Sequence, residues 1–137
     1  MTSALDVVKQ AYKAWEAKDK QALRNLLHTN YKGKIPGGME IIGIEGAEQC
    51  LEQCPSECHS ENEMYITEGN KVVRIWDMVT TAPKPYRIRM AELNIVEDGK
   101  VILNEAFFDT AAFPEEVQKE FQEFLKKQPV GVSGKSS

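Results

Sequence analysis

The sequence contains no apolar run of about eighteen residues, the length that a membrane-spanning helix needs. Its first residues, MTSALDVVKQ, lack the basic and then apolar order of a secretory signal peptide. Basic residues are not in excess, because 17 Lys and Arg stand against 21 Asp and Glu. The resulting net charge of -4 repels a phosphate backbone. We therefore expect a cytoplasmic protein that binds neither membranes nor nucleic acid.

Cysteine and histidine are scarce as well, with three and two residues in a chain of 137. Cys50, Cys54 and Cys58 lie four residues apart, and His59 follows directly. Structural zinc sites usually place a second pair of ligands at some distance from the first, which this short stretch does not do. The odd number of cysteines in a cytosolic protein also disfavours disulfides. We interpret Cys50 and Cys54 as apolar helix positions, place Cys58 and His59 in a polar loop, and predict no metal and no cofactor.

Helical spacing of apolar residues dominates the first part of the chain. Apolar residues recur every three or four positions over 3–19, which predicts an amphipathic helix. A second, short helix follows Asp19, which suits an N-cap, and a third begins near Glu45 and ends at Pro55. The stretch 31–46 holds five glycines and a proline, so it predicts a short strand, a turn and an extended return.

Strand-like sequence follows in three runs, at 70–81, 86–96 and 100–110. The Asp98-Gly99 pair between the second and third runs is a strong hairpin signal, so the three runs predict an antiparallel meander. A last helix begins at Pro114.

These elements predict an α+β fold in which a curved antiparallel sheet buries one face against the opening helices. The absence of an internal linker predicts a single domain over residues 1–127. The small and polar residues 128–137 predict a mobile tail.

Three phrases carry a resemblance to a known family: VVKQAYKAWEAKDKQALRNLL, IEGAEQCL and EDGKVILNEAFFDTAAF. In this order they resemble the nuclear transport factor 2-like superfamily, in particular its SnoaL-like and ketosteroid isomerase-like branch. The resemblance implies a cone-shaped half-barrel in which helices and a curved sheet enclose an apolar pocket. It also implies a homodimer formed through the outer face of the sheet. Because this fold supports many reactions, function has to be argued from the pocket residues.

This sequence lacks residues that two reactions of the superfamily require. In the comparison with ketosteroid isomerases, Tyr12 takes the place of the tyrosine donor and Glu92 that of the protonated acid, but Ile35 stands where the base would be. In the comparison with limonene epoxide hydrolase, Asp77 takes the place of one carboxylate. Ile75 and Ala106 replace the arginine and the second carboxylate, and these departures argue against both reactions.

A SnoaL-like reaction needs fewer groups, essentially one carboxylate in an apolar pocket whose burial raises its pKa. The resemblance therefore implies Asp77 or Glu92 as acid and base, with Tyr12 as a hydrogen-bond donor. Expected ligand-binding residues are Trp15, Trp76, Asn104 and Phe108. Strand alternation puts Asp77 on the face opposite to that of Trp76, and both faces are partly apolar, so the sequence leaves open which face is inward.

A structural role competes with the catalytic one at both acids. Glu92 lies near Arg87 and Arg89 in sequence, and an ion pair among them on the outer sheet face would explain all three residues. Asp77 could equally form a salt bridge to a neighbouring strand. Two functions remain open. One is an isomerase, cyclase or dehydratase acting on a hydrophobic small molecule, and the other is a non-catalytic domain for ligand binding or dimerisation.

Overall fold

The computed structural model describes residues 2–53, 57–82, 84–127 and 132–134. Three helices precede most of the sheet: α1 (Ala4–Glu16), α2 (Lys20–Leu26) and α3 (Gly43–Gln53). The Ser3 side chain caps α1 by accepting from the backbone N–H of Asp6 at 3.1 Å, and Asp19 caps α2 in the same way. The three predicted helices are therefore confirmed, and Asp19 is the predicted cap of the second.

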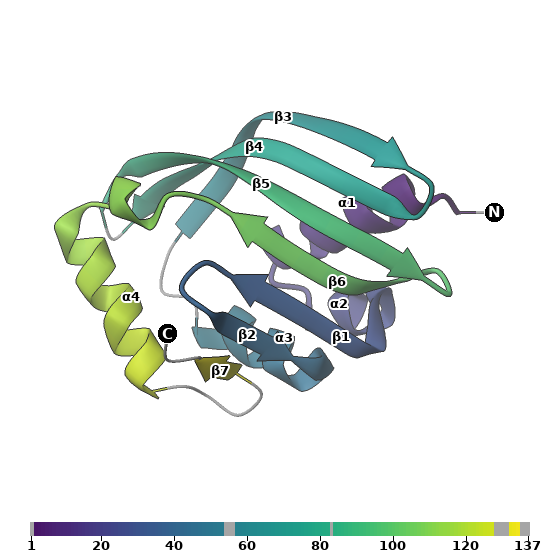
Figure 1. Ribbon diagram of the computed structural model, residues 1–137, viewed down its shortest axis with the longest axis horizontal. Coiled ribbons are helices and arrows are strands. Elements are labelled where there is room, and N and C mark those ends of the chain that lie inside the picture. Colours follow the sequence, from purple (N-terminus) through teal and green to yellow (C-terminus); the bar gives the residue numbers. More distant parts are fainter. Residues whose placement is uncertain (1, 54–56, 83, 128–131, 135–137) are drawn as a thin grey trace.

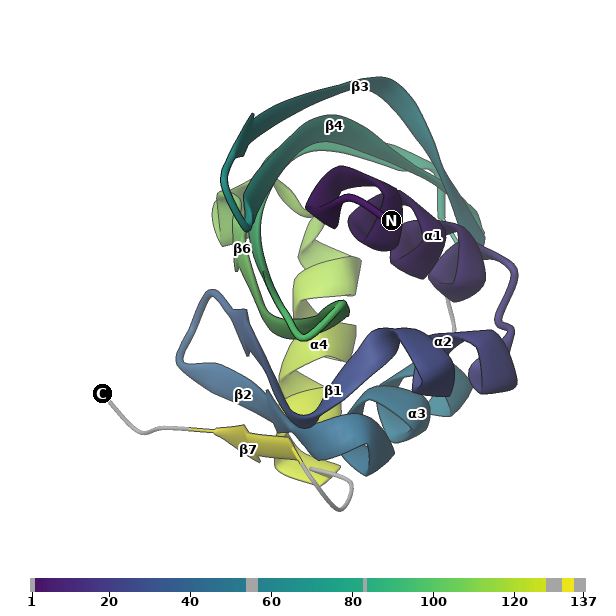
Figure 2. The same cartoon turned by 90° about the vertical axis from the view of Figure 1, so that its right-hand side faces the viewer.

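The strands form one curved sheet, which Figure 2 shows bent around α1. Within the described residues its order is β3-β4-β5-β6-β1-β2-β7. The bounds are β1 (Leu27–Ile35), β2 (Met39–Ile42), β3 (Glu57–Glu68), β4 (Lys71–Ala82), β5 (Tyr86–Glu97), β6 (Lys100–Phe107) and β7 (Val132–Gly134). Helices α1, α2 and α3 lie on the concave side, as Figures 1 and 2 show together. The predicted α+β fold with a curved sheet is confirmed.

The sheet is mixed, which corrects the prediction of a purely antiparallel one. β1 runs parallel to β6, with Gly33 opposite Asn104, while β3, β4, β5 and β6 form the antiparallel meander. The meander predicted from three runs gains β3 as its outermost strand. This parallel pair joins segments about 70 residues apart, so local sequence patterns do not reveal it.

The segment predicted as a polar loop, which includes Cys58 and His59, is the long edge strand β3. Its sequence, ECHSENEMYITE, is mostly polar, and most of its residues are exposed, including the apolar Met64 and Ile66. An edge strand at the rim of a sheet needs no continuous apolar face, because only part of its surface meets the core. Its polar composition therefore led to the wrong prediction of a loop.

Strand alternation determines which side chains enter the interior. Along β5 the residues Ile88, Met90, Glu92, Asn94 and Val96 are buried, and the residues between them are more exposed. The β5–β6 hairpin turns at Asp98 and Gly99, both of which have positive φ, as the Asp-Gly signal predicted. The even-numbered positions of β4 and β5 therefore face the helices.

The main core lies between the helices and the sheet. Val8 and Ala47 are completely buried there, next to Leu23, Leu51 and Val101. A second apolar cluster of Trp76, Ile88, Met90 and Phe113 lies toward the end of the sheet that α4 (Glu115–Lys127) approaches, after the short 3-10 turn Thr110–Ala112. None of the described helices is long and apolar enough to cross a membrane.

Helix α4 lies at the end of the molecule opposite the N-terminus (Figure 1). Beyond it, β7 pairs with β2 through Val132, Ser133 and Gly134. The prediction of a mobile tail covers these three residues, which form a strand, and otherwise falls outside the described residues. The single domain over residues 1–127 stays a prediction.

Candidate functional site

A cavity of about 970 Å³ lies between the concave face of the sheet and the helices. Much of its wall is aliphatic, from Leu23, Leu27, Met39, Ile41 and Met90. Aromatic side chains form much of the rest: Tyr12, Trp15, Tyr31, Trp76, Tyr86, Phe108 and Phe113. Such a lining favours a hydrophobic ligand, and the volume is that of ordinary small-molecule sites.

Glu92 is the buried carboxyl in this cavity. It lies in the middle of β5, is 9% exposed, and its Oε1 accepts a hydrogen bond from Trp76 Nε1 at 2.8 Å. Burial raises the pKa of the Glu92 carboxyl, and hydrogen bonds from Asn104 and Trp76 offset part of that rise. Glu92 is therefore a carboxyl whose proton is held more tightly than usual because its site is buried and largely apolar.

The position of Glu92 corrects the outer-face ion pair that the sequence suggested. Arg87 and Arg89 occupy odd positions of β5 and point away from the cavity, whereas Glu92 occupies an even position and points inward. Residues that lie close in sequence are thus separated by the sheet.

A row of polar groups continues from Glu92 across the sheet to α1. Asn94 Nδ2 donates to the Tyr12 hydroxyl oxygen at 2.8 Å, and Asn104 Nδ2 donates to Asn94 Oδ1 at 2.8 Å. Burial raises the pKa of Tyr12 well above its ordinary value, so its phenol keeps its proton. Since the Tyr12 oxygen already accepts from Asn94, its O–H is directed to another acceptor, either Glu92 or a ligand oxygen.

Arg74 lies beside this row and is 2% exposed. Its guanidinium lies over the faces of two neighbouring rings, 4.0 Å from the centroid of Tyr12 and 4.1 Å from that of Trp76. Its Nε and Nη2 donate to Glu63 Oε2 at 3.1 and 2.7 Å, and Nη2 also donates to Ser60 Oγ at 2.8 Å. Arg74 is therefore a buried cation whose hydrogen-bond and ion-pair partners come from β3 and α1.

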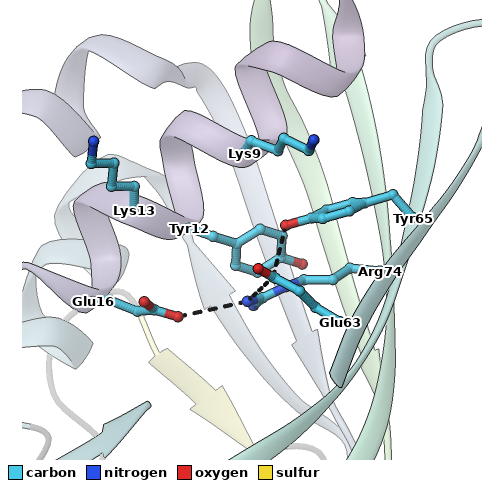
Figure 3. A pocket seen from close by; sticks show the side chains of 7 residues that line it. All are labelled: Lys9, Tyr12, Lys13, Glu16, Glu63, Tyr65 and Arg74. Carbon is cyan, nitrogen blue, oxygen red and sulfur yellow. Dashed lines mark hydrogen bonds and ion pairs between the residues drawn. The ribbon is translucent and has the colours of Figure 1, made fainter. Parts of the chain in front are cut away.

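A second, smaller pocket of about 470 Å³ lies on the other side of Arg74 (Figure 3). Glu16 and Glu63 point toward the guanidinium there, and Lys9 and Lys13 reach into the pocket from α1. Tyr12, Glu16 and Arg74 line both this side pocket and the main cavity. The two spaces are therefore neighbours, and Arg74 is part of the wall between them.

Asp77, the other predicted acid, does not line the cavity. It occupies an odd position of β4, and its Oδ1 accepts from Arg89 Nη1 at 3.0 Å. Its Oδ2 accepts from Arg87 Nη1 and Asn62 Nδ2, each at 2.9 Å. These hydrogen bonds, that of Asn62 first, lower the pKa of Asp77. Asp77 is thus a permanently charged member of a network on the outer face.

The other predicted site residues come together around the cavity. Tyr12, Trp15, Trp76, Asn104 and Phe108 all line it, with Glu92 at its polar part. Their roles stay predictions. Sequence reasoning did not name Arg74 or Asn94 as site residues, although the alternation that groups Arg74 with Trp76 was the signal that could have found Arg74.

Two of the three cysteines are close to the cavity. Cys50 is buried on α3 and Cys58 is exposed on β3, and both line the cavity wall. Cys54 lies outside the described residues. Within the part of the chain that the structure describes, no group of three or more His, Cys, Asp and Glu side chains is placed to hold a metal ion.

Several solved structures have a fold similar to that of this protein. A similar structure is an NTF2-like protein from Cytophaga hutchinsonii, 21% identical, with a TM-score of 0.69 over 81% of this chain and 94% of that one. TerC, co-crystallized with polyporic acid, is 18% identical, with a TM-score of 0.73 over 85% of this chain and 98% of the other. A candidate polyketide cyclase from Pseudomonas putida is 14% identical, with a TM-score of 0.72 over 82% and 96%.

At these identities the similar structures show the fold alone. No curated protein matches the chain. A sequence model of the SnoaL-like domain, however, matches residues 8–104, which include most of α1, the helices α2 and α3, and the parts of the strands that carry Arg74, Glu92, Asn94 and Asn104. This match spans more than half of the chain, and the protein therefore belongs to the SnoaL-like domain family.

Proposed function

We propose that this protein is an enzyme that transfers protons on a hydrophobic carbonyl compound, as an isomerase, cyclase or dehydratase, with Glu92 as its acid and base. The observation that carries the proposal is one buried carboxyl at the polar part of a largely apolar cavity. Its raised pKa suits it to both accept and release a proton. The likeness to a candidate polyketide cyclase and to TerC with polyporic acid supports an oxygenated, ring-containing ligand.

The proposed step begins with ionised Glu92, which removes a proton from a carbon beside the ligand carbonyl. The electron pair of that C–H bond forms a carbon–carbon double bond, and the carbonyl π pair moves to oxygen. The Tyr12 O–H donates to the resulting enolate oxygen, and Asn94 fixes the phenol by donating to its oxygen at 2.8 Å. Protonated Glu92 then returns the proton to the same carbon or, where a double bond beside that carbon extends the enolate into a dienolate, to the far end of the dienolate.

The test uses α-tetralone, a bicyclic aryl ketone, in D₂O. Proton NMR follows the replacement of hydrogen by deuterium at the carbon beside the carbonyl. We expect wild-type protein to accelerate this exchange and Glu92→Gln to lose about 10²- to 10⁴-fold of the acceleration, the usual contribution of a general acid–base group. Quenching of tryptophan fluorescence measures affinity, since Trp15 and Trp76 line the cavity, and we expect the dissociation constant to stay within about threefold.

A matched control changes the other buried acid. Asp77→Asn alters a carboxyl of the adjacent strand on the outer face, so exchange should proceed at the wild-type rate. Equal exchange by wild-type protein and Glu92→Gln would contradict the proposal. So would binding of the ketone with no acceleration by wild-type protein.

The alternative function is binding of a hydrophobic small molecule without turnover. One observation favours it: the polar groups near Glu92 bond to one another, as in the contacts among Tyr12, Asn94 and Asn104, which suits a structural network. Under this alternative α-tetralone quenches the fluorescence, but exchange stays at the rate measured without protein.

We also propose that the protein forms a homodimer through the outer face of its sheet. Met64, Ile66 and Phe107 are 51%, 58% and 52% exposed there, on the side away from the helices. Analytical ultracentrifugation should find a dimer that Ile66→Ser weakens at least about tenfold, because it places a polar group in the apolar interface. A wild-type monomer at high protein concentration would contradict this. A cytoplasmic location and the absence of nucleic-acid and membrane partners stay predictions.

A further inference from the structure

Arg74 occupies an unusual place for an arginine, because its side chain is almost fully buried in the wall between two pockets. The register of the sheet puts it directly opposite Glu92, in the pair Arg74↔Glu92. A cation and a carboxyl in that relation commonly form an ion pair. Instead, the guanidinium donates to Glu63 and Ser60 in the side pocket (Figure 3). Glu92 is left with neutral donors.

Both rings next to the guanidinium carry polar groups close to Glu92. Trp76 Nε1 donates to Glu92 Oε1 at 2.8 Å, and Tyr12 carries the phenol of the polar row. The ring centroids of Tyr12 and Trp76 are 6.5 Å apart and inclined by 57°. The guanidinium attracts one face of each ring. Removing it would therefore leave the Tyr12 and Trp76 rings free to change their tilt. The direction of the Trp76 N–H therefore depends on Arg74.

Arg74 is itself held from the side pocket. Glu63 accepts two of its N–H groups, and Glu16 lies 3.6 Å from Nη2 while also accepting from Ser60. Bonds to two neighbours of the same edge strand fix the plane of the guanidinium. A chain of contacts thus runs from the solvent-facing side pocket through Arg74 to the cavity carboxyl.

We propose that Arg74 is a positioning residue for Glu92: anchored by Glu63, it holds the rings of Tyr12 and Trp76 so that the Trp76 N–H stays directed at the Glu92 carboxyl and the Tyr12 O–H at the ligand oxygen. The inference rests on the proposed role of Glu92 in proton transfer. The Arg74 charge also lowers the pKa of Glu92 against the larger effect of burial. Loss of the arginine should therefore raise that pKa, both by removing a positive charge and by weakening the Trp76 hydrogen bond.

The direct readout is the side-chain indole N–H signal of Trp76 in ¹H–¹⁵N NMR, assigned with Trp76→Phe. This signal should follow the titration of Glu92, because the indole N–H donates to that carboxyl. In Arg74→Met we expect the signal to move and its titration midpoint to rise. Arg74→Lys keeps the charge without the planar stack, so the signal should move while the midpoint stays closer to that of wild-type protein.

The second readout is deuterium exchange into α-tetralone. Displaced catalytic groups lose rate rather than affinity, so Arg74→Met should lower the maximal exchange rate by about 10- to 100-fold while KM changes by less than about threefold. Arg89→Met is the matched control, because this arginine of the adjacent strand bonds Asp77 on the outer face. It should leave the Trp76 signal and the exchange rate unchanged.

The proposal is overturned if folded Arg74→Met keeps both the wild-type position and the wild-type midpoint of the Trp76 signal. Should Arg74→Met not fold, Glu63→Ala keeps the arginine and removes only its anchor, on a carboxylate that is 45% exposed. A Trp76 signal unmoved by Glu63→Ala then overturns the proposal. Failure of the proposed function is distinguishable, because Glu92→Gln would then keep full exchange activity, while the NMR readout does not depend on turnover.

Discussion

Two carboxyls, Glu92 and Asp77, lie on adjacent strands of one sheet and face opposite sides of it. Their exposures are nearly equal, at 9% and 7%. Asp77 receives hydrogen bonds from Arg87, Arg89 and Asn62, and its pKa is lowered. Glu92 receives hydrogen bonds from the neutral Asn104 and Trp76 side chains, and its pKa is raised. Burial has the largest effect on the pKa of Glu92, whereas hydrogen bonds, that of Asn62 first and those of the arginines after it, have the largest effect at Asp77.

The two acids differ in the groups that surround their carboxyls. Hydrogen bonds from Asn62, Arg89 and Arg87 lower the pKa of Asp77, and the same bonds join β3, β4 and β5. Glu92 loses its nearest cation because Glu63 and Ser60 bind Arg74 on the other side of the Tyr12 and Trp76 rings. The diversion of Arg74 therefore leaves the cavity carboxyl of Glu92 with neutral hydrogen-bond donors.

The pH dependence of stability should differ in sign at the two acids, and Glu92 should show the larger effect. With its folded pKa raised, Glu92 retains its proton while the unfolded chain loses it, so its contribution becomes unfavourable as pH rises from about 4 through the folded pKa. Glu92→Gln removes this unfavourable contribution to stability, because glutamine does not ionise. We expect thermal unfolding to give Glu92→Gln a Tm about 3 to 6 °C above wild type at pH 8.

That difference in Tm should close below about pH 4, where Glu92 is protonated in both states. A Glu92→Gln variant that is less stable than wild type at pH 8 would contradict the assignment of burial as the dominant effect. A constant difference at all pH values would show that a change in packing, and not ionisation, separates the two proteins.

Local patterns predicted much of the architecture. The helical spacing before residue 19, the cap at Asp19 and the Asp98-Gly99 turn each act within a few residues, so the sequence carries them directly. The strand β3 was missed because an edge strand has polar residues on both faces. The parallel pairing of β1 with β6 was missed because it depends on packing between distant segments.

The site was only partly predictable for a related reason. Both faces of β4 are partly apolar, with Ile75 and Val79 on one side and Trp76 and Met78 on the other, so alternation could not choose the inward face. Register then decides which charges meet: Asp77 lies opposite Arg89, and Arg74 lies opposite Glu92. These pairs form only in the folded sheet. The arginines near Glu92 in sequence, Arg87 and Arg89, suggested a different ion-pair partner for it.

The smallest effect is expected at Asp77, whose arginine partners are half exposed and therefore screened by solvent and salt. Its lowered folded pKa means that its contribution is present above the unfolded pKa of about 3.9 and is lost as pH falls through the folded value. Asp77→Asn should therefore have a lower Tm than wild type at pH 7, by less than the Glu92→Gln difference. The deficit should shrink both in acid and in 1 M NaCl. A deficit that resists acid and salt alike would assign the role of Asp77 to the shape of its hydrogen bonds, and the contrast with Glu92 would no longer be one of charge.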